Sequence, residues 1–507
     1  MSSQYAVHVA RGSSYFMIQN ISTSLLQLAS FAILTRLIST EDIGVLAVLN
    51  LVSGISTTIG TLSLPNAVIK FVAEHLGRGE RDSAASVFYQ SLRTTFLFTV
   101  PLAIAVFLGA SDLSSALLHE ASYAVYFRYL AFDIVLASGL LPVLTAAFLG
   151  LQKFKQRATI FIVNAAIRQG FIIALIILLH DFFGLVIAWV LGDLILTVVC
   201  FVYFARILGG PKFNFKTRRL LVFSAPLWLS DAVGFASTWF DRALLVLFVP
   251  LATLGIYNAT LTAFSVLVGI GGAATSTLLP AYSSMQQSDQ RERLVPALKT
   301  STRYASFVLV PLGFGLLATA KPALTLFVGQ AYIDGTDPLM VLAGTYAVAS
   351  VAAAATPMLI ALGQTRLVSL GSVATVALSL AIAWILAPIF GMFGAALARG
   401  VGMIVGTALT ILFLKRKMRV EFDTDGIMKS LIAAIVMTSV VIAVQALLYS
   451  RYLVPLYVTV GAFVYMGMLR LLKAIRQEDV QLVRGYLGPK LRFASDLLNI
   501  LLSPSAE

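Results

Sequence analysis

The chain has 507 residues, of which 59% are hydrophobic and 12% are charged, and its mean hydropathy is +0.91. This composition excludes a protein whose whole surface faces water and predicts a membrane protein throughout. The formal net charge of +13 does not indicate nucleic-acid binding, because the cations lie in short connections and form no continuous basic face with interleaved aromatics.

Fourteen apolar stretches follow one another, each long enough to cross roughly 30 Å of hydrocarbon at about 1.5 Å per residue. They cover 13–37, 43–64, 84–109, 122–149, 158–179, 183–205, 220–249, 254–283, 298–319, 337–362, 367–388, 391–414, 428–449 and 452–472. The predicted fold class is an all-α polytopic membrane protein with about 14 transmembrane helices. We expect the first span to serve as its own insertion signal, without a cleaved signal peptide.

Lys and Arg residues gather in every second connection between these stretches. The connections rich in cations carry Lys70, Arg78, Arg81, Lys153, Lys155, Arg157, Lys212, Lys216, Arg218, Arg219, Arg291, Arg293, Lys299, Lys415, Arg416, Lys417 and Arg419. The opposite side has only Arg36, Lys321 and Arg451. Since cations near span ends stay in the cytoplasm, this asymmetry predicts that both termini are cytoplasmic. Most of these loop cations are interpreted as topology signals that also contact anionic lipid.

The chain repeats itself at a shift of 210 residues. Arg93, Pro101 and Leu102 match Arg303, Pro311 and Leu312, and Phe183, Gly184, Ala188 and Gly192 match Phe393, Gly394, Ala398 and Gly402. Spans one to six and seven to twelve are therefore predicted to be two copies of one unit, inserted in the same direction and related by an axis along the membrane normal. The predicted domains are lobes at 1–210 and 211–420, spans thirteen and fourteen at 421–474, and a cytoplasmic amphipathic tail at 475–507.

Ionisable side chains inside spans are costly unless they face protein or water, so they are the functional candidates. They are Arg93, Arg128, Asp133, Arg168, Asp193, Asp231, Asp241, Arg242 and Arg399. Arg93 and its repeat partner Arg303 lie at the inner edge and are interpreted as structural. Asp193 and Arg399 lie in corresponding sixth spans, where a structural ion pair is as consistent with the sequence as function. Neutral polar residues inside spans, Asn50 and Asn258 among them, are interpreted as interhelical hydrogen-bonding groups or cleft residues.

No motif for enzyme chemistry is present in the sequence: it has no Walker A motif and no spacing of carboxylates and histidines that suits a metal. The single cysteine, Cys200, lies within an apolar span and is interpreted as a small core residue. We therefore expect a transport protein, not an enzyme, with no metal or cofactor. Its energy source is expected to be an ion gradient, the membrane potential or consumption of substrate, with H⁺ or Na⁺ as the coupling ion.

Several short segments resemble one known family. They are Thr35 to Gly44, Asp241 with Leu244 to Phe248, Leu254 to Ala259, Leu278 to Pro280, Phe327 to Tyr332 and Ile360 to Gly363. In this order, and with fourteen spans in a six-plus-six-plus-two arrangement, they are similar to the polysaccharide-biosynthesis flippases of the multidrug/oligosaccharidyl-lipid/polysaccharide exporter superfamily. The resemblance covers nearly all of 10–472.

The resemblance implies two helical bundles that carry a polyprenyl- or dolichyl-linked oligosaccharide from the cytoplasmic to the outer leaflet by alternating access. It implies a prokaryotic plasma-membrane protein whose partners are the lipid-linked glycan, membrane lipids and polymerases or glycosyltransferases, with no nucleic acid. Spans one, two, four, seven, eight and ten line the cleft in that family. The favoured cleft residues are therefore Asp241, Arg242, Asp231, Asp133, Arg128, Arg36, Asn50 and Asn258, and the less favoured ones are Arg168, Arg399 and Asp193.

Two alternatives stay open at this point. One is a multidrug antiporter of the same superfamily, although such proteins usually stop at twelve spans. The other is a peptidoglycan-precursor flippase.

Overall fold

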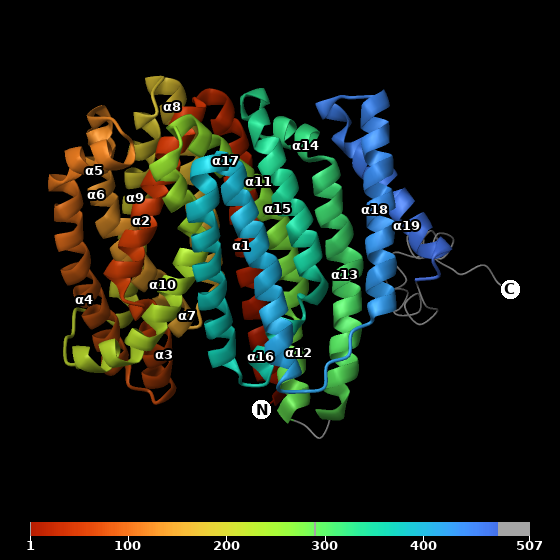
Figure 1. The fold of residues 1–507 in the computed structure, drawn as a ribbon. Coiled ribbons are helices and arrows are strands. Elements are labelled where there is room, and N and C mark those ends of the chain that lie inside the picture. Colours follow the sequence, from red (N-terminus) through yellow and green to blue (C-terminus); the bar gives the residue numbers. More distant parts are fainter. Residues whose placement is uncertain (1, 288–290, 475–507) are drawn as a thin grey trace. The chain divides into compact units, whose positions relative to one another are not determined.

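The computed structural model describes residues 2–287 and 291–474, and every regular element among these is helical (Figure 1). Within these described ranges, twelve helices are long and apolar enough to cross a membrane, or thirteen if the bent pair Gln330–Ala352 and Ala355–Ala361 forms one span. The prediction of an all-α, multi-pass membrane protein is thus confirmed. The count of about 14 spans and the relation between the repeated lobes stay predictions, and the predicted tail at 475–507 lies outside the described residues.

The chain separates into two compact units, Met1–Asn258 and Ala259–Glu507. The helices of the first unit are α1 (Ser2–Leu37), α2 (Thr40–Thr61), α3 (Leu64–Gly77), α4 (Arg81–Leu108), α5 (Ala110–Leu117), η1 (Ala121–Tyr123), α6 (Ala124–Asp133), η2 (Ile134–Leu140), α7 (Leu141–Gly150), α8 (Phe154–Leu179), α9 (Phe183–Leu208) and α10 (Thr217–Phe248). Within it α1 packs along α8, and α8 packs along α9. The first unit also contains the start of α11 (Leu251–Ser276), which continues into the second.

Helix α2 has a defined beginning and a strained end. At its start Ser39 and Asp42 form a capping box, in which the Ser39 hydroxyl accepts from the Asp42 amide and the Asp42 carboxylate accepts from the Ser39 amide. At its end Leu62 and Ser63 adopt left-handed φ values of 47° and 58°, which residues other than glycine rarely do. The Ser63 hydroxyl donates to Asp231 of α10 over 2.6 Å. This hydrogen bond stabilises the turn between α2 and α3.

The fourth predicted span is not one regular helix. Helix α6 ends at Asp133, a π-helical segment covers Ile134–Leu140, and α7 begins with Pro142 in its first turn. A proline lacks the amide that an inner helical turn needs and clashes with the carbonyl four residues before it, so the backbone widens ahead of Pro142. The widened turn is packed on α2, because the Ser138 hydroxyl donates to the Ser53 carbonyl over 3.2 Å.

The second unit continues with α12 (Leu278–Gln287), η3 (Arg291–Arg293), α13 (Leu294–Ala318), α14 (Ala320–Phe327), η4 (Gln330–Gly335), α15 (Thr336–Ala349), η5 (Ser350–Ala352), α16 (Ala355–Ala361), α17 (Thr365–Lys415), α18 (Thr424–Leu447), η6 (Arg451–Leu453) and α19 (Val454–Leu471). Figure 1 shows α18 and α19 beside α13, and these three helices share one hydrophobic core. The Ser430 and Tyr465 hydroxyls, 2.8 Å apart, join α18 to α19 inside it.

The segment α17 is a helical hairpin. Gly391 within it is non-helical, with φ 54° and ψ −133°. On either side of it Gly394 approaches Leu386, Gly402 approaches Ser379, and Gly406 approaches Thr375. The contacting residues lie progressively farther from Gly391 on both sides, as in two antiparallel helices. Gly391 is therefore the turn between two packed helices. The same pattern occurs in the first unit, where Gly184 of α9 approaches Leu175 of α8.

Candidate functional site

A polar cavity of about 470 Å³ lies inside the first unit. Its lining residues come from α1, α2, the α6 to α7 region, α8 and α9. They are Thr23, Gln27, Asn50, Ser53, Asp133, Ala137, Leu141, Pro142, Thr145, Phe161, Asn164, Ala165, Arg168, Gln169, Trp189, Asp193 and Leu196. Each of these segments is long and apolar enough to cross a membrane, so the cavity gathers polar groups within a membrane-spanning bundle.

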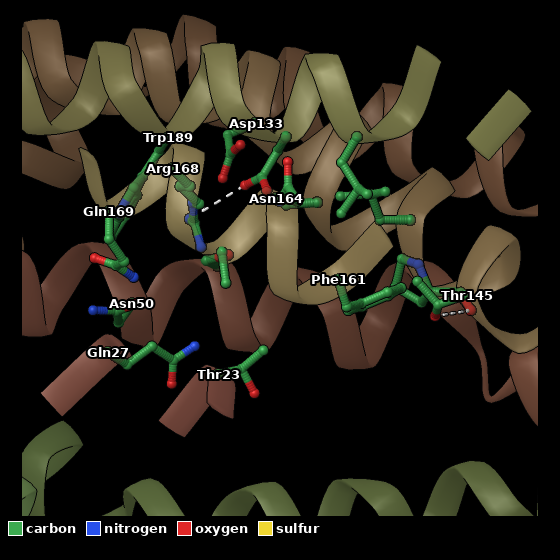
Figure 2. Close-up of a pocket in the computed structure, with 17 residues that line it drawn as sticks. Thr23, Gln27, Asn50, Asp133, Thr145, Phe161, Asn164, Arg168, Gln169 and Trp189 are labelled. Carbon is green, nitrogen blue, oxygen red and sulfur yellow. Dashed lines mark hydrogen bonds and ion pairs between the residues drawn. The ribbon is translucent and has the colours of Figure 1, made fainter. Parts of the chain in front are cut away.

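The spacing of the lining residues along each helix matches helical periodicity. Residues three or four apart on a helix share one face, and the lining pairs have that spacing: 23 and 27 on α1, 50 and 53 on α2, 164 and 168 on α8, and 189 and 193 on α9. Each of these helices therefore turns one polar stripe toward the cavity. Asp133 is the last residue of α6, directly before the widened turn, and Figure 2 shows its carboxyl near Asn164 and Arg168 of α8.

The charged groups of the cavity form one cluster. The Arg168 guanidinium lies 3.2 Å from the Asp193 carboxylate and stacks over the Trp189 ring at 5.4 Å. Asp133, 3% exposed, interacts electrostatically with both Asp193 and Arg168. A side chain at Gly192 would meet the Arg168 stem, so that glycine makes room for the guanidinium beside Asp193.

Two acceptor oxygens of the cavity lack donors. The Oδ1 atoms of Asp133 and Asn164 are buried and have no hydrogen-bond partner among the residues that the structure describes. Buried polar atoms in proteins are nearly always paired with protein, water or ligand. The Nε atom of Arg168, which lines the same cavity, is likewise buried without a hydrogen-bond partner among the described residues. The cavity therefore suits a group that both donates and accepts hydrogen bonds.

The sequence-favoured residues Asp241, Arg242 and Asn258 form a separate cluster where α10 meets α11. Asp241 is fully buried and accepts from the Tyr257 hydroxyl at 2.6 Å and from the Arg242 amide at 2.8 Å. The Arg242 guanidinium donates to the Asn258 amide oxygen over 3.2 Å and stacks over Trp239 at 3.6 Å. These contacts hold the two helices together, and a binding role for the cluster stays a prediction.

The other sequence candidates are not among the residues that line the cavity. Asp231 accepts from Ser63 at the end of α2. Arg128 is exposed on α6, and Arg36 is exposed and donates to the Ala32 carbonyl of its own helix. Arg399 is half-buried in the second helix of the α17 hairpin, in the second unit. The structure thus brings together Asp133, Asn50, Asp193 and Arg168, of which the sequence ranked the last two low.

Several lining residues were not selected from the sequence. Asn164, Gln169 and Trp189 are neutral residues within apolar spans, and Thr23 and Ser53 are small hydroxyl residues of a kind that is common in membrane helices. The available signal was the spacing of Asn164 four residues before Arg168, which places an amide on the same face as a buried charge.

By sequence, the chain is similar to proteins of polysaccharide biosynthesis. A family model described as "polysaccharide biosynthesis protein" matches residues 33–336. The chain is 23% identical over 481 residues to the probable low-salt glycan biosynthesis flippase of Haloferax volcanii, covering 92% of this chain and 97% of that protein. It is 24% identical over 369 residues to the succinoglycan biosynthesis transport protein of Rhizobium meliloti, covering 70% of each.

Comparison with solved structures concerns the fold. The lipid II flippase MurJ, in an inward closed conformation, superposes with a TM-score of 0.72 at 15% identity, covering 90% of this chain and 98% of that one. An inward-facing multidrug resistance transporter of the MATE family, from the MOP superfamily, superposes with a TM-score of 0.61 at 15% identity, covering 78% of this chain and 94% of that one. The chain therefore has the fold of these transporters.

Proposed function

Since the chain belongs to the polysaccharide biosynthesis protein family, we propose that it is a flippase for a lipid-linked oligosaccharide. The cargo is a sugar chain joined through phosphate or diphosphate to a polyprenyl or dolichyl lipid. The protein moves it from the cytoplasmic to the outer leaflet of a prokaryotic plasma membrane. Two relatives named for glycan or succinoglycan transport support this proposal.

The observation that carries the proposal is the polar cavity within the first unit. A sugar chain is too polar to cross hydrocarbon, where each unsatisfied hydrogen-bonding group costs several kcal/mol. A transporter for it therefore needs polar groups at membrane depth, held by helices that satisfy their own backbone. The amides, hydroxyls and charges that line the cavity between α1, α2, α8 and α9 meet this need.

Transport is proposed to proceed by alternating access, with the cavity open to one side of the membrane at a time. An ion gradient or the membrane potential is the proposed driving force, and H⁺ or Na⁺ is the proposed coupling ion. The excess of Lys and Arg in alternate loops supports cytoplasmic termini. In that orientation the protein receives its substrate where glycosyltransferases complete it and releases it where a polymerase or ligase uses it.

Deletion of the gene tests the proposal directly. We expect loss of the surface polysaccharide together with accumulation of lipid-linked oligosaccharide, detected by lipid extraction and mass spectrometry. Expression of the wild-type chain should restore the surface polysaccharide and remove the accumulated intermediate. A deletion strain with normal surface glycan and no accumulated intermediate would refute the proposal, while drug hypersensitivity alone would favour an antiporter and lysis during growth would favour a peptidoglycan-precursor flippase.

A further inference from the structure

The charges that line the first-unit cavity are unsuited to a phosphate. The lining contains the carboxyls of Asp133 and Asp193 and the guanidinium of Arg168. Arg168 is already engaged by Asp193 and stacked on Trp189. Even if one carboxyl holds a proton, the lining has no surplus positive charge. Phosphate recognition favours surplus positive charge and bidentate guanidinium donors, and this lining offers an anionic head group no net positive charge.

The unpaired atoms of the cavity call for a group that both donates and accepts hydrogen bonds, because the buried Arg168 Nε also lacks a partner among the described residues. Asp133 Oδ1 and Asn164 Oδ1 are both acceptors, and neither has a hydrogen-bond partner within the described part of the chain. Each of these buried acceptors that a ligand leaves unpaired costs roughly 1–3 kcal/mol. Sugar hydroxyl groups both donate and accept hydrogen bonds, so they can pair with all three atoms. A phosphate or diphosphate ester only accepts them at neutral pH and leaves both oxygens unpaired.

The remaining lining matches a sugar in shape and polarity. The side-chain amides of Gln27, Asn50 and Gln169 both donate and accept, as hydroxyls do. Apolar surface from Leu141 and Phe161 lies in the same cavity and suits the C–H faces of a pyranose ring. The volume of about 470 Å³ is in the range of small-molecule sites, roughly 300–1,000 Å³. A single coupling ion needs only a few oxygens and would leave most of this space unfilled.

We propose that this cavity is the subsite for the sugar portion of the lipid-linked oligosaccharide and that the phosphate binds elsewhere. Asp133 and Asn164 accept hydrogen bonds from the hydroxyl or amino groups of the sugar, and the Arg168–Asp193 pair keeps the guanidinium away from the phosphate. This inference rests on the proposed function and specifies which part of the cargo the cavity recognises.

The test compares two probes with the full-length chain in lipid nanodiscs. The first is the lipid-linked glycan fraction extracted from cells that lack the gene, and the second is the same fraction after mild acid hydrolysis has removed the sugars. Binding is measured by native mass spectrometry. We expect the wild-type chain to bind the glycosylated lipid about tenfold more tightly or better. A tenfold difference in affinity is about the effect of satisfying one buried hydrogen-bonding group.

Asp133→Leu and Asn164→Leu should each reduce that preference to about threefold or less while binding of the stripped lipid stays the same. Leu is close in size to Asp and Asn but has no acceptor oxygen, and unchanged binding of the stripped lipid shows that each variant is folded. Asp425→Leu, the same change at an exposed ion pair of α18, is the matched control and should behave as wild type.

The outcomes separate the two proposals. Absence of binding to both lipids by the wild-type chain refutes the flippase function itself. Equal binding of both lipids by the wild-type chain, or equal loss of both in the Asp133 and Asn164 variants, leaves the flippase function standing and refutes the sugar subsite.

Discussion

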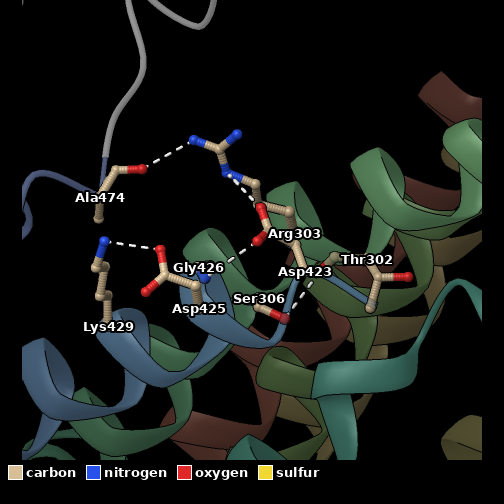
Figure 3. Close-up of polar contacts among 8 residues, drawn as sticks. All are labelled: Thr302, Arg303, Ser306, Asp423, Asp425, Gly426, Lys429 and Ala474. Carbon is tan, nitrogen blue, oxygen red and sulfur yellow. Dashed lines mark hydrogen bonds and ion pairs between the residues drawn. The ribbon is translucent and has the colours of Figure 1, made fainter. Parts of the chain in front are cut away.

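Arg303 and Asp423 form an ion pair in which the guanidinium Nε lies 3.3 Å from the carboxylate, and each side chain is only 7% exposed (Figure 3). Arg303 also donates to the Ala474 carbonyl over 2.8 Å. Asp423 in turn caps α18 by accepting from the Gly426 amide. Arg303 thus joins α13 both to the beginning of α18, through Asp423, and to the segment just after α19, through Ala474.

Arg303→Ala should destabilise the second unit strongly. The substitution removes the guanidinium from a buried carboxylate, which typically costs about 3–5 kcal/mol. Thermal or denaturant unfolding of the purified protein measures the change. Lys429→Ala breaks the exposed pair with Asp425 and should cost only about 0.3–0.5 kcal/mol. Similar losses in both variants would mean that the Arg303–Asp423 pair does not hold the C-terminal helices.

Gly255→Ala should prevent the close packing of α11 on α2. A methyl group at this position would overlap the Thr40 carbonyl oxygen, so the helices must separate, at a cost of about 1–3 kcal/mol or more. Gly234→Ala is the matched control, because no atom lies within 4 Å of a side chain there. It should be neutral or stabilising by up to about 1 kcal/mol. Protein yield and melting temperature report both effects, and an unaffected Gly255 variant would contradict the packing.

Arg168→Ala should lower glycan export by about tenfold or more, because Asp193 stays buried without its guanidinium partner. Asp193→Asn added to this variant removes the uncompensated charge and should restore part of the export. Surface glycan is quantified in a complemented deletion strain, normalised to the amount of protein in the membrane. Full export by the single variant, or no recovery in the double variant, would argue against an electrostatic role.

Lowering the pH should reduce the stability of the fold at the end of α3. His75 Nδ1 and Glu80 Oε2 are 2.6 Å apart, and this hydrogen bond, with the charges of His75 and Arg78, lowers the pKa of Glu80. A lowered folded-state pKa means that the ionised carboxylate stabilises the fold. That stabilisation is complete above the usual glutamate pKa of about 4.3 and is lost as pH falls through the lower folded value.

Glu80→Gln should therefore show a smaller loss of melting temperature than wild type when the pH is lowered from 5 to 3, about the range in which a glutamate titrates. Identical pH profiles would show that Glu80 makes no such contribution.

Cysteine labelling tests the proposed topology. Lys417 precedes α18 and Arg451 follows it, so a spanning α18 puts them on opposite sides. The native Cys200 is buried and provides a low background. In intact cells a membrane-impermeant maleimide should label Arg451→Cys at once and Lys417→Cys only after permeabilisation. The reverse pattern would invert the orientation, and equal labelling of both would exclude α18 as a span.

Much of the fold was predictable from the sequence, whereas the candidate site was predictable only in part. Apolar length marks a membrane helix locally, so most predicted spans match helices within a few residues. The sequence predicted a turn between spans ending at 388 and starting at 391, and Gly391 is the non-helical residue there. The π-helical widening after Asp133 was not predicted, because it depends on how Pro142 and the packing on α2 are accommodated together.

Sequence by itself determined that the chain is a multi-pass helical membrane protein and which few ionisable residues had to be sheltered inside it. Those conclusions depend on the transfer free energy of each residue, which is a local property. Only the tertiary structure decided that Asp133, Arg168 and Asp193 share one cavity, whereas Asp241 is enclosed between α10 and α11. Which side chains meet depends on how each helix is rotated against its neighbours, and that rotation is set by packing between residues far apart in the chain.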